Sequence, residues 1–580
     1  MSRTKRRVGT RSRVVVALTA GIALLWALRL VSAWADRTVA FVTFGAFIAA
    51  LVLLLDWFVA SFGPGLWRSA RSVGASVWRA LRDDTEVRAL VGRHPRFFGW
   101  LGRRTSRERP GGLYLTLTTA SALYFLSGFV SIARSLALSR AITSYDPRIS
   151  ALLRVFRTPA LTRLLWIATV LADSRVILLL AGISALLLTM WGRRGEAAML
   201  VITLSSGVVL QTLLKLAFRR PRPPVAFALI KEPSSFSFPS GHAFESLLLA
   251  GVVVFVLWRG SGNLRVRLAV LFVAGSAVAA VGLSRVYLGV HWTSDVFASW
   301  SLALAWLSVT CGCYLMLVRY GGMREAWPVW SGLRSRRVAT LAVSLAAVAA
   351  VVAGAQVDPL LAKVTAETPA RPWVVATGPT GRPLPTSADL RRLPLHSEKL
   401  DGSPQEPIGI VFVGTPAMLT SAFEAAGWQV ADKPSFATLT RAVFAALGNR
   451  PYPTAPVTPT FLGGAVQDIA FEKHEGVATV RRRHHARFWR THVTLAGVPV
   501  WVATASFDSR LEIGSTIPLP THHIAPDIDA EQAFVVDGLV GTGRVALLER
   551  LRVTSPSTGT NAQGDPWFTQ GYASVLEATR

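Results

Sequence analysis

The sequence contains little cysteine and little charge. Only two of its 580 residues are cysteines, and charged residues make up 16%, against roughly 25% in soluble globular proteins. Cys311 and Cys313 lie two positions apart within one apolar run, so we expect both to be buried and unpaired. The scarcity of charge argues against a purely soluble protein. The scarcity of cysteine excludes a scaffold held together by disulfides.

Acidic residues are also scarce, and their distribution is uneven. The chain has 62 basic and 33 acidic residues, for a net charge of +29. Residues 356–580 contain 20 of each, which leaves 42 basic and 13 acidic residues in 1–355. A basic excess can indicate a nucleic-acid partner, but here the basic residues punctuate long apolar runs. That pattern is typical of a membrane protein, so we predict a lipid bilayer and no nucleic acid as the partner.

Nine apolar runs approach the length of a membrane span, which requires roughly 20 mostly apolar residues. They cover residues 13–34, 38–61, 112–135, 174–191, 196–215, 242–258, 266–284, 294–317 and 337–355. Leu161–Asp173 predicts a shorter helix at the membrane surface that leads into the fourth run. The first run is long for a signal peptide and has no obvious cleavage site, so we expect an uncleaved anchor.

Lysine and arginine predict the orientation of these spans, because cytoplasmic loops carry an excess of both. A cytoplasmic N-terminus places the most basic segments inside, namely residues 1–13, 62–111, 192–195, 259–265 and 318–336. Nine spans then place residues 356–580 outside. We therefore predict a multi-pass protein of a bacterial inner membrane with a periplasmic or extracytoplasmic C-terminal domain.

The composition divides the chain into five regions. They are a two-span anchor with a basic cytoplasmic segment (1–111), a helical core (112–318), a ninth span with its cytoplasmic lead-in (319–355), a Pro-rich linker (356–400) and a soluble domain (401–580). In the soluble domain we predict strands at 408–414, 466–471, 478–480 and 498–505 and helices at 417–426, 438–447 and 530–540. The predicted fold class is an all-α polytopic membrane bundle followed by a soluble α+β domain.

Three short motifs lie at the predicted outer ends of spans five to eight. They are Lys215 followed after six residues by Arg222-Pro, Ser240-Gly241-His242 after a proline, and Ser-Arg285 followed by His291 and Asp295. Ionisable residues at a membrane edge are costly and therefore mark functional sites. Lys215, Arg222 and Arg285 supply positive charge for phosphoryl oxygens, and Ser240 and Gly241 open a helix whose N-terminus favours phosphate. Since no Asp/Glu/His cluster here has metal-ligand spacing, we predict no metal and no cofactor.

Two histidines and a carboxylate complete this set. His291 and Asp295 are four residues apart, so on a helical turn the carboxylate can hold one ring nitrogen of His291. The other nitrogen is then an unprotonated nucleophile. His242 begins the helix of the second motif. The combination of residues is suited to attack on a phosphoester.

The three motifs, in this order, resemble the signature of the type 2 phosphatidic acid phosphatase (PAP2) superfamily, and the resemblance covers roughly residues 112–318. It implies that His291 attacks to form a phosphohistidine, that Asp295 orients it, and that His242 protonates the leaving oxygen without a metal. It also implies a membrane lipid phosphate or diphosphate as substrate. Two alternatives are a catalytically silent scaffold that binds lipid phosphate and a vanadium haloperoxidase, which belongs to the same superfamily. Protein partners cannot be assigned.

Other charged residues near the membrane carry weaker signals. We interpret Arg219, Arg220 and Lys231 as ordinary charges that extend to the membrane surface. Asp56, Asp146 and Asp173 have no comparable partners in sequence, so we expect them to be structural.

A second polar group lies in the predicted soluble domain. It comprises His484, His485, His522, His523, Asp527 and Asp529, with Glu531 close by. These residues could form a metal or polar ligand site. The alternative is a solvated strand edge followed by a helix N-terminus, where acidic residues are favoured. The region resembles the LssY-like C-terminal domain that accompanies PAP2 phosphatases.

Overall fold

The computed structural model describes most of the chain from residue 69 onward. The described residues are 69, 72–77, 79–106, 108, 111–138, 141–230, 234–321, 395–448, 450–475, 482–495, 497–513 and 520–579. The spans predicted at 13–34, 38–61 and 337–355, and nearly all of the linker, lie outside these residues. Helices α3 (Thr85–Arg93) and α4 (Pro95–Thr105) lie between the first described residues and the bundle.

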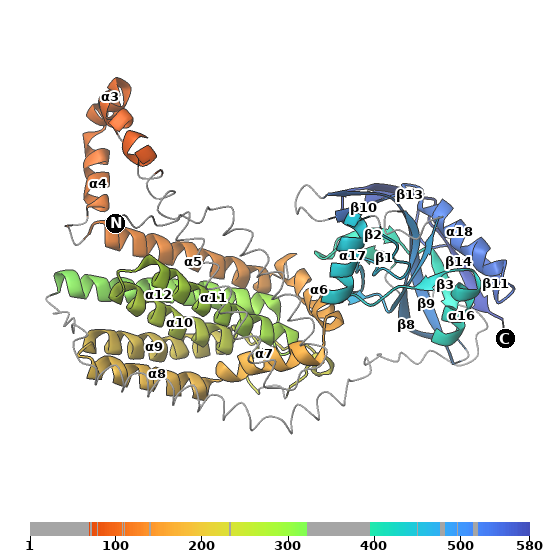
Figure 1. The fold of residues 1–580 in the computed structure, drawn as a ribbon, viewed down its shortest axis with the longest axis horizontal. Helices are drawn as coiled ribbons and strands as arrows, with labels where there is room; N and C mark the ends of the chain where they lie inside the picture. Colours follow the sequence, from red (N-terminus) through yellow and green to blue (C-terminus); the bar gives the residue numbers. More distant parts are fainter. Residues whose placement is uncertain are drawn as a thin grey trace, which may run out of the picture.

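The helical region forms one bundle (Figure 1). Its helices are α5 (Leu113–Ala137), α6 (Ala141–Val155), α7 (Pro159–Leu171), α8 (Ser174–Met190), α9 (Arg194–Phe218), α10 (Gly241–Gly260), α11 (Leu264–Tyr287) and α12 (Thr293–Tyr320), with a 3-10 turn at Val225–Phe227. Among the described residues, five helices are long and apolar enough to cross a membrane, or six if α7 and α8 count as one span bent by 54°. The predicted spans from 112 to 317 therefore correspond to helices, and α7 is the short helix predicted before span four.

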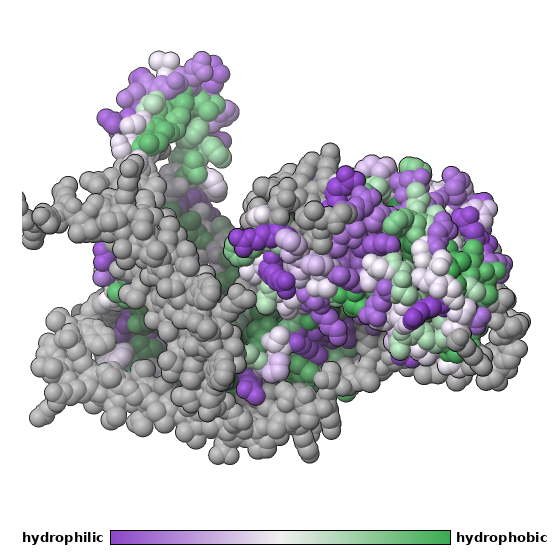
Figure 2. Space-filling model, turned by 45° about the vertical axis from the view of Figure 1, so that its right-hand side comes forward, coloured by the Kyte–Doolittle hydropathy of each residue, from purple (hydrophilic) through white to green (hydrophobic). Residues whose placement is uncertain are grey.

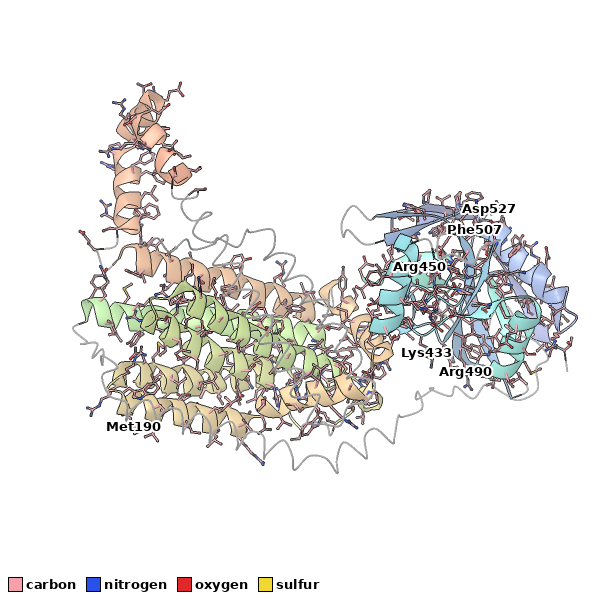
Figure 3. All side chains as sticks on the ribbon, in the orientation of Figure 1. Met190, Lys433, Arg450, Arg490, Phe507 and Asp527 are labelled. Atoms are coloured by element: carbon pink, nitrogen blue, oxygen red, sulfur yellow. The ribbon has the colours of Figure 1, made fainter. Side chains whose placement is uncertain are left out.

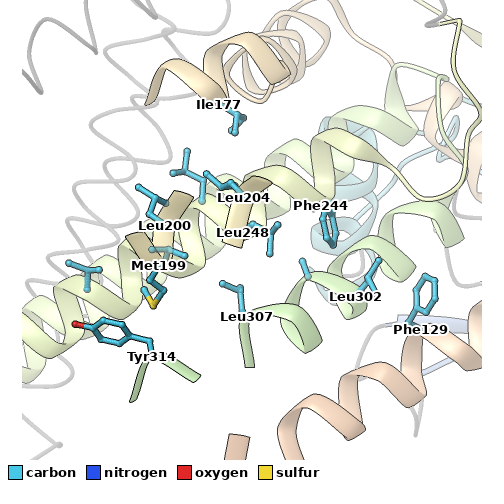
Figure 4. Packing of buried hydrophobic residues seen from close by; sticks show 14 of the residues in the cluster. Phe129, Ile177, Met199, Leu200, Leu204, Phe244, Leu248, Leu302, Leu307 and Tyr314 are labelled. Carbon is cyan, nitrogen blue, oxygen red and sulfur yellow. The ribbon is translucent and has the colours of Figure 1, made fainter. Parts of the chain in front are cut away.

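The bundle core is built from leucine, phenylalanine and small residues on helices α9, α10 and α12. Leu200, Leu204, Leu248 and Leu302 are at most 5% exposed and pack together in Figure 4. Gly207 lets α10 approach α9, because a Cβ at that position would lie 2.5 Å from Cδ1 of Leu248. Small residues at such crossings are the usual packing of membrane helices. Large apolar side chains such as those of Tyr124 and Leu178 instead face outward, as expected for contact with lipid.

The C-terminal region is a separate α+β unit. Its helices are α16 (Pro416–Ala425), α17 (Phe436–Gly448) and α18 (Ile528–Val540). Its main sheet has the order β11-β14-β3-β9-β8-β7-β4, with β10 paired to β9, and a smaller sheet has the order β2-β1-β5-β6. The strands are β1 (His396–Glu398), β2 (Pro404–Pro407), β3 (Ile410–Val413), β4 (Gln429–Val430), β5 (Phe461–Leu462), β6 (Ala465–Val466), β7 (Ile469–His474), β8 (Arg483–Leu495), β9 (Val498–Ile513), β10 (Pro520–Ile524), β11 (Val545–Arg552), β12 (Ser557–Thr560), β13 (Pro566–Thr569) and β14 (Tyr572–Ala578). Much of the domain surface visible in Figure 2 is hydrophilic.

The structure corrects several sequence expectations. Strand β8 was considered only as a solvated strand edge, because Arg483, Arg487 and the neighbouring histidines break the usual apolar alternation. The structure contradicts the solvated edge, since residues 483–489 of β8 are all buried. Helix α6 was not predicted either, since it is short and polar. Cys313 is exposed on the bundle surface whereas Cys311 is half-buried, so the expectation that both are buried is wrong for Cys313. The all-α membrane bundle followed by an α+β domain is confirmed. The strand predicted at 478–480 lies outside the described residues.

Candidate active site

The three sequence motifs meet at one end of the bundle. The second begins α10, the third spans the end of α11 and the start of α12, and the first begins in the last turn of α9. Met190, at the C-terminal end of α8, lies at the opposite end of the bundle (Figure 3). Residues separated by up to 80 positions in sequence therefore share one site.

His291 and Asp295 form a buried pair. Nδ1 of His291 lies 3.3 Å from a carboxylate oxygen of Asp295, and both side chains are at most 2% exposed. Nε2 of His291 lies 3.1 Å from a guanidinium nitrogen of Arg222. Because Arg222 can only donate, this contact favours the tautomer with its proton on Nδ1 and a lone pair on Nε2. The ring is therefore oriented with its basic nitrogen toward the cation.

Three cations surround this pair. Arg222 is held by the carbonyls of Ser235 and Val290 at 2.8 and 2.6 Å, and Lys215 donates to the carbonyl of Phe236 at 2.7 Å. Arg285 is 2% exposed and donates to the hydroxyl of Thr169. All three act electrostatically on His291 and on His242. Positive charge concentrated around a neutral imidazole suits a phosphate group.

The start of α10 adds groups that can bind an anion. Ser240 is the N-cap residue of α10, yet its side chain makes no capping bond, and its fully buried hydroxyl has no hydrogen-bond partner among the described residues. Nε of Arg285 is likewise buried without a partner there. Gly241 follows, and a Cβ at that position would lie 2.8 Å from Nε2 of Gln211. His242 is partly exposed in the first turn of α10. Unpartnered polar groups at a helix N-terminus can accept a phosphate.

The loop before His291 depends on one glycine. Gly289 has φ of +76°, and a Cβ there would lie 2.1 Å from the carbonyl oxygen of Phe227. A side chain is therefore excluded both by the backbone conformation and by the close approach of the neighbouring turn. This contact fixes the loop that carries His291.

Two charged residues and a serine near the pair were not recognised in the sequence. Arg220 donates to Asp295, and it also donates to Asp146 at 2.7 Å, so the prediction that Arg220 extends to the membrane surface is wrong. Asp146, predicted to lack partners, also accepts from the amide of Ser294 at 2.9 Å. Ser237 donates to Asp295. These contacts join residues 58 to 148 positions apart, which no local motif could reveal.

The tail residues do not gather into one site. Adjacent residues of a strand point to opposite faces, so His484 contacts Glu531 at 2.9 Å while His485 lies 3.5 Å from Asp508 on the other face. His523 pairs with Asp565 at another place. Asp527 caps α18 and Asp529 accepts from Thr569 at 2.6 Å. His522 lies on β10, opposite Leu511. Within the described residues, no group of three or more His, Cys, Asp or Glu could hold a metal.

Comparisons with known proteins match both the bundle and the C-terminal domain. The family model of the PAP2 superfamily matches residues 196–319, and that of the LssY C-terminus matches residues 389–573. Phosphatidylglycerophosphatase B of Bacillus subtilis is 31% identical over 167 residues, which cover 29% of this chain and 81% of that protein. Undecaprenyl-diphosphatase of Sulfolobus acidocaldarius is 32% identical over 131 residues, 22% of this chain and 58% of that protein. A crystal structure of a transmembrane PAP2-type phosphatidylglycerolphosphate phosphatase from Bacillus subtilis is 28% identical with a TM-score of 0.32, and the match covers 34% of this chain and 98% of that one.

The fold and the site define a class, that of multi-pass membrane phosphatases in which helices converge on a histidine, a carboxylate and several cations. The match over most of a relative more than 30% identical then identifies the family. The chain belongs to the PAP2 superfamily and is a hydrolase of phosphoric esters or diphosphates.

Proposed function

We propose that this protein hydrolyses the phosphomonoester or diphosphate of a membrane lipid through a phosphohistidine intermediate on His291. The observation that carries the proposal is the buried ring of His291, with Nδ1 toward Asp295 and Nε2 toward Arg222. A protein that only bound lipid phosphate would need the cations but not an oriented, unprotonated imidazole. The geometry therefore favours an enzyme over a silent scaffold.

The steps follow from the positions of the groups. The phosphate enters beside Nε2, and Arg222 turns its donor from that nitrogen to a phosphoryl oxygen. Nε2 attacks phosphorus, the bond to the lipid oxygen breaks, and His242 gives that oxygen a proton. His242 then takes a proton from water, whose oxygen attacks phosphorus and breaks the P–N bond. Lys215, Arg285 and the start of α10 stabilise the charge on the phosphoryl oxygens in both steps.

A lipid substrate is supported by the place of the site and by the relatives. The site lies at one end of the apolar bundle, which is where a bilayer crossed by these helices would place its lipid headgroups. The two relatives named above are a phosphatidylglycerophosphatase and an undecaprenyl-diphosphatase. We therefore propose phosphatidylglycerol phosphate, phosphatidic acid and prenyl diphosphates as the substrates to test first.

We further propose that the site faces the outside of a bacterial inner membrane. The turns at the opposite end of the bundle, at 191–193 and 261–263, carry or adjoin Arg193, Arg259 and Arg265. Basic residues mark the cytoplasmic end of a span. The catalytic end is then external, and so is the C-terminus. A reporter enzyme that works only outside the cytoplasm is expected to be active when fused at Arg580, and one that works only in the cytoplasm is expected to be inactive.

The proposal is tested with purified full-length protein and its His291→Ala variant. Phosphate release from a panel of lipid phosphates and diphosphates should fall to the uncatalysed background in the variant, because the nucleophile is gone. His492→Ala replaces an exposed histidine of β8 and should retain wild-type rates. Wild-type turnover in His291→Ala would overturn the mechanism.

Two further measurements refine the mechanism. Acid-labile, base-stable radiolabel should be trapped on the wild-type protein after rapid quench with a labelled substrate, and none on His291→Ala. Turnover should persist in EDTA, since side chains supply the positive charge in the proposed mechanism. Loss of activity in EDTA that Mg²⁺ restores would contradict the metal-free route.

A further inference from the structure

Helix α6 contacts both the candidate active site and the C-terminal domain. It packs against α5, α11 and α12 on the bundle side and against β6 on the domain side, and Figure 1 shows it between the two units. Of three consecutive residues of α6, Asp146 faces the bundle, whereas Pro147 and Arg148 face the C-terminal domain. A shift of α6 would therefore change its contacts with both the bundle and the C-terminal domain.

On the bundle side, Asp146 supports the carboxylate beside His291. It is 1% exposed and accepts hydrogen bonds from Arg220 at 2.7 Å, from the Ser294 amide at 2.9 Å and from the Ser294 hydroxyl. The same guanidinium of Arg220 donates to Asp295. Arg220 thus joins two carboxylates, one on α6 and one on α12. Since a buried charge requires its partner, moving Asp146 would disturb Arg220 and then Asp295.

On the domain side, Arg148 anchors the C-terminal domain. Its Nε and Nη2 atoms donate to one carboxylate oxygen of Glu398 at 3.1 and 2.8 Å, and the two side chains are only 11% and 18% exposed. That oxygen also accepts from the amide of Gly464 at 3.0 Å. Ser144, one turn earlier on α6, donates to the carbonyl of Asp401. These polar contacts lie at α6 and fix the register of the two surfaces.

An apolar contact accompanies the ion pair. Ala151 of α6 is buried with Phe461 and Val466 of the β5–β6 hairpin. The turn of that hairpin consists of Gly463 and Gly464, both with positive φ, so the hairpin is tight and Gly464 faces Pro147. Hydrophobic contact at the centre and charged groups beside it are the usual features of a specific interface.

We propose that docking of the C-terminal domain on α6 positions Asp146, and that the domain thereby sets the activity of the phosphatase. This inference rests on the proposed role of His291 and Asp295. Asp146 and Arg220 are positioning residues, because they act through Asp295 and do not touch the phosphate. The C-terminal domain is then an internal activator whose release from α6 lowers turnover.

The experiment uses full-length protein in dodecyl maltoside micelles with dioleoyl phosphatidic acid. Glu398→Arg and Arg148→Glu should each lower kcat about tenfold, a typical size for coupling between linked sites, and leave KM within twofold. The double variant restores an ion pair in reverse and should recover kcat to within about threefold of wild type. Glu549→Arg, an exposed charge reversal on β11, is the matched control and should behave as wild type.

Hydrogen exchange over residues 141–155 reports docking without reference to activity. It should rise in each single variant and return toward the wild-type value in the double variant. Asp146→Asn should lower kcat, and adding Glu398→Arg to it should lower kcat no further, because both act along one path.

The outcomes separate this inference from the function on which it rests. Faster exchange in α6 with wild-type kcat overturns the coupling, and unchanged exchange in the single variants overturns the docking. A wild-type protein that releases no phosphate, or an active His291→Ala variant, overturns the proposed function, and the coupling with it. In that case kcat gives no information about Asp295, but hydrogen exchange over residues 141–155 still shows whether the C-terminal domain docks on α6.

Discussion

The membrane bundle and the C-terminal domain each bury a histidine close to an aspartate, and the two pairs differ in what surrounds them. His291 lies 3.3 Å from Asp295, and His485 lies 3.5 Å from Asp508. In the C-terminal domain, Arg483 pairs with Glu472 and Asp508, so the arginine charge is neutralised. In the bundle, Lys215 and Arg285 donate to a carbonyl and a hydroxyl, which hold a cation in place without neutralising it.

The comparison teaches how to separate a reactive site from a structural one. Both regions contain His, Asp and Arg, and both are buried, so composition and burial do not distinguish them. The bundle in addition has, at a helix N-terminus, a buried serine hydroxyl with no hydrogen-bond partner in the described part of the chain. Cations that are held by neutral groups, next to a hydroxyl that can still donate a hydrogen bond, are suited to binding an anion. An arginine enclosed by carboxylates instead stabilises the fold.

The substitution Asp295→Asn is expected to have the largest effect on the difference between the two histidine sites. The amide removes the negative charge that supports the imidazole of His291 and deprives Arg220 of one of its two carboxylates. We expect kcat to fall about 1000-fold with little change in KM, within the range for loss of a group that assists proton or charge transfer. Steady-state phosphate release is the measurement.

Asp527→Asn is the control, because Asp527 caps α18 and asparagine caps a helix equally well. This variant should keep the wild-type rate. A D295N enzyme as active as D527N would remove the distinction between the two histidine sites.

A second test concerns the hydroxyl of Ser240. If it binds a phosphoryl oxygen in the transition state, Ser240→Ala should lower kcat about 100-fold, as for other single donors to a developing anion. Ser261→Ala, at the other end of the same helix, should change nothing. Equal rates for the two variants would mean that the unpartnered hydroxyl takes no part in the reaction.

The third prediction concerns the acid stability of the C-terminal domain. Burial first, and the nearby Arg487 second, lower the pKa of His485 to about 4. An unfolded histidine takes up a proton below about pH 6.5, whereas the folded one does not until about pH 4. The contribution of His485 to the free energy of unfolding should thus be constant above pH 6.5 and fall as the pH drops from 6.5 to 4, by about 2 kcal/mol at pH 5.

His485→Gln removes this dependence, so the difference from wild type isolates it. The comparison is needed because burial raises the pKa of Glu472 to about 8, which gives a pH dependence of opposite sign. Hydrogen exchange of β8, corrected for the intrinsic rate at each pH, is the measurement, with His492→Gln as the exposed control. An identical pH dependence for wild type and H485Q would contradict the prediction.

Much of the bundle could be predicted from sequence because lipid imposes long apolar runs and costly charges there. The motif residues from Lys215 to Asp295 could likewise be recognised by their spacing. Asp146 and Arg220 could not, since they interact across 74 positions and each alone resembles an ordinary surface charge. The burial of strand β8 was missed because its arginines violate the usual apolar alternation. His484 and His485 could have been assigned to opposite faces had a strand buried on both faces been expected there.

The backbone at Gly289 restricts the routes by which this enzyme could acquire new substrates. Its positive φ and its approach to Phe227 exclude every side chain. A library that varies the residues around His291, position 289 included, should therefore return glycine at position 289 in all active clones, whatever phosphoester is selected. Changes of specificity must come from elements that do not carry this loop, and His291 would keep its place while the residues around it diverge.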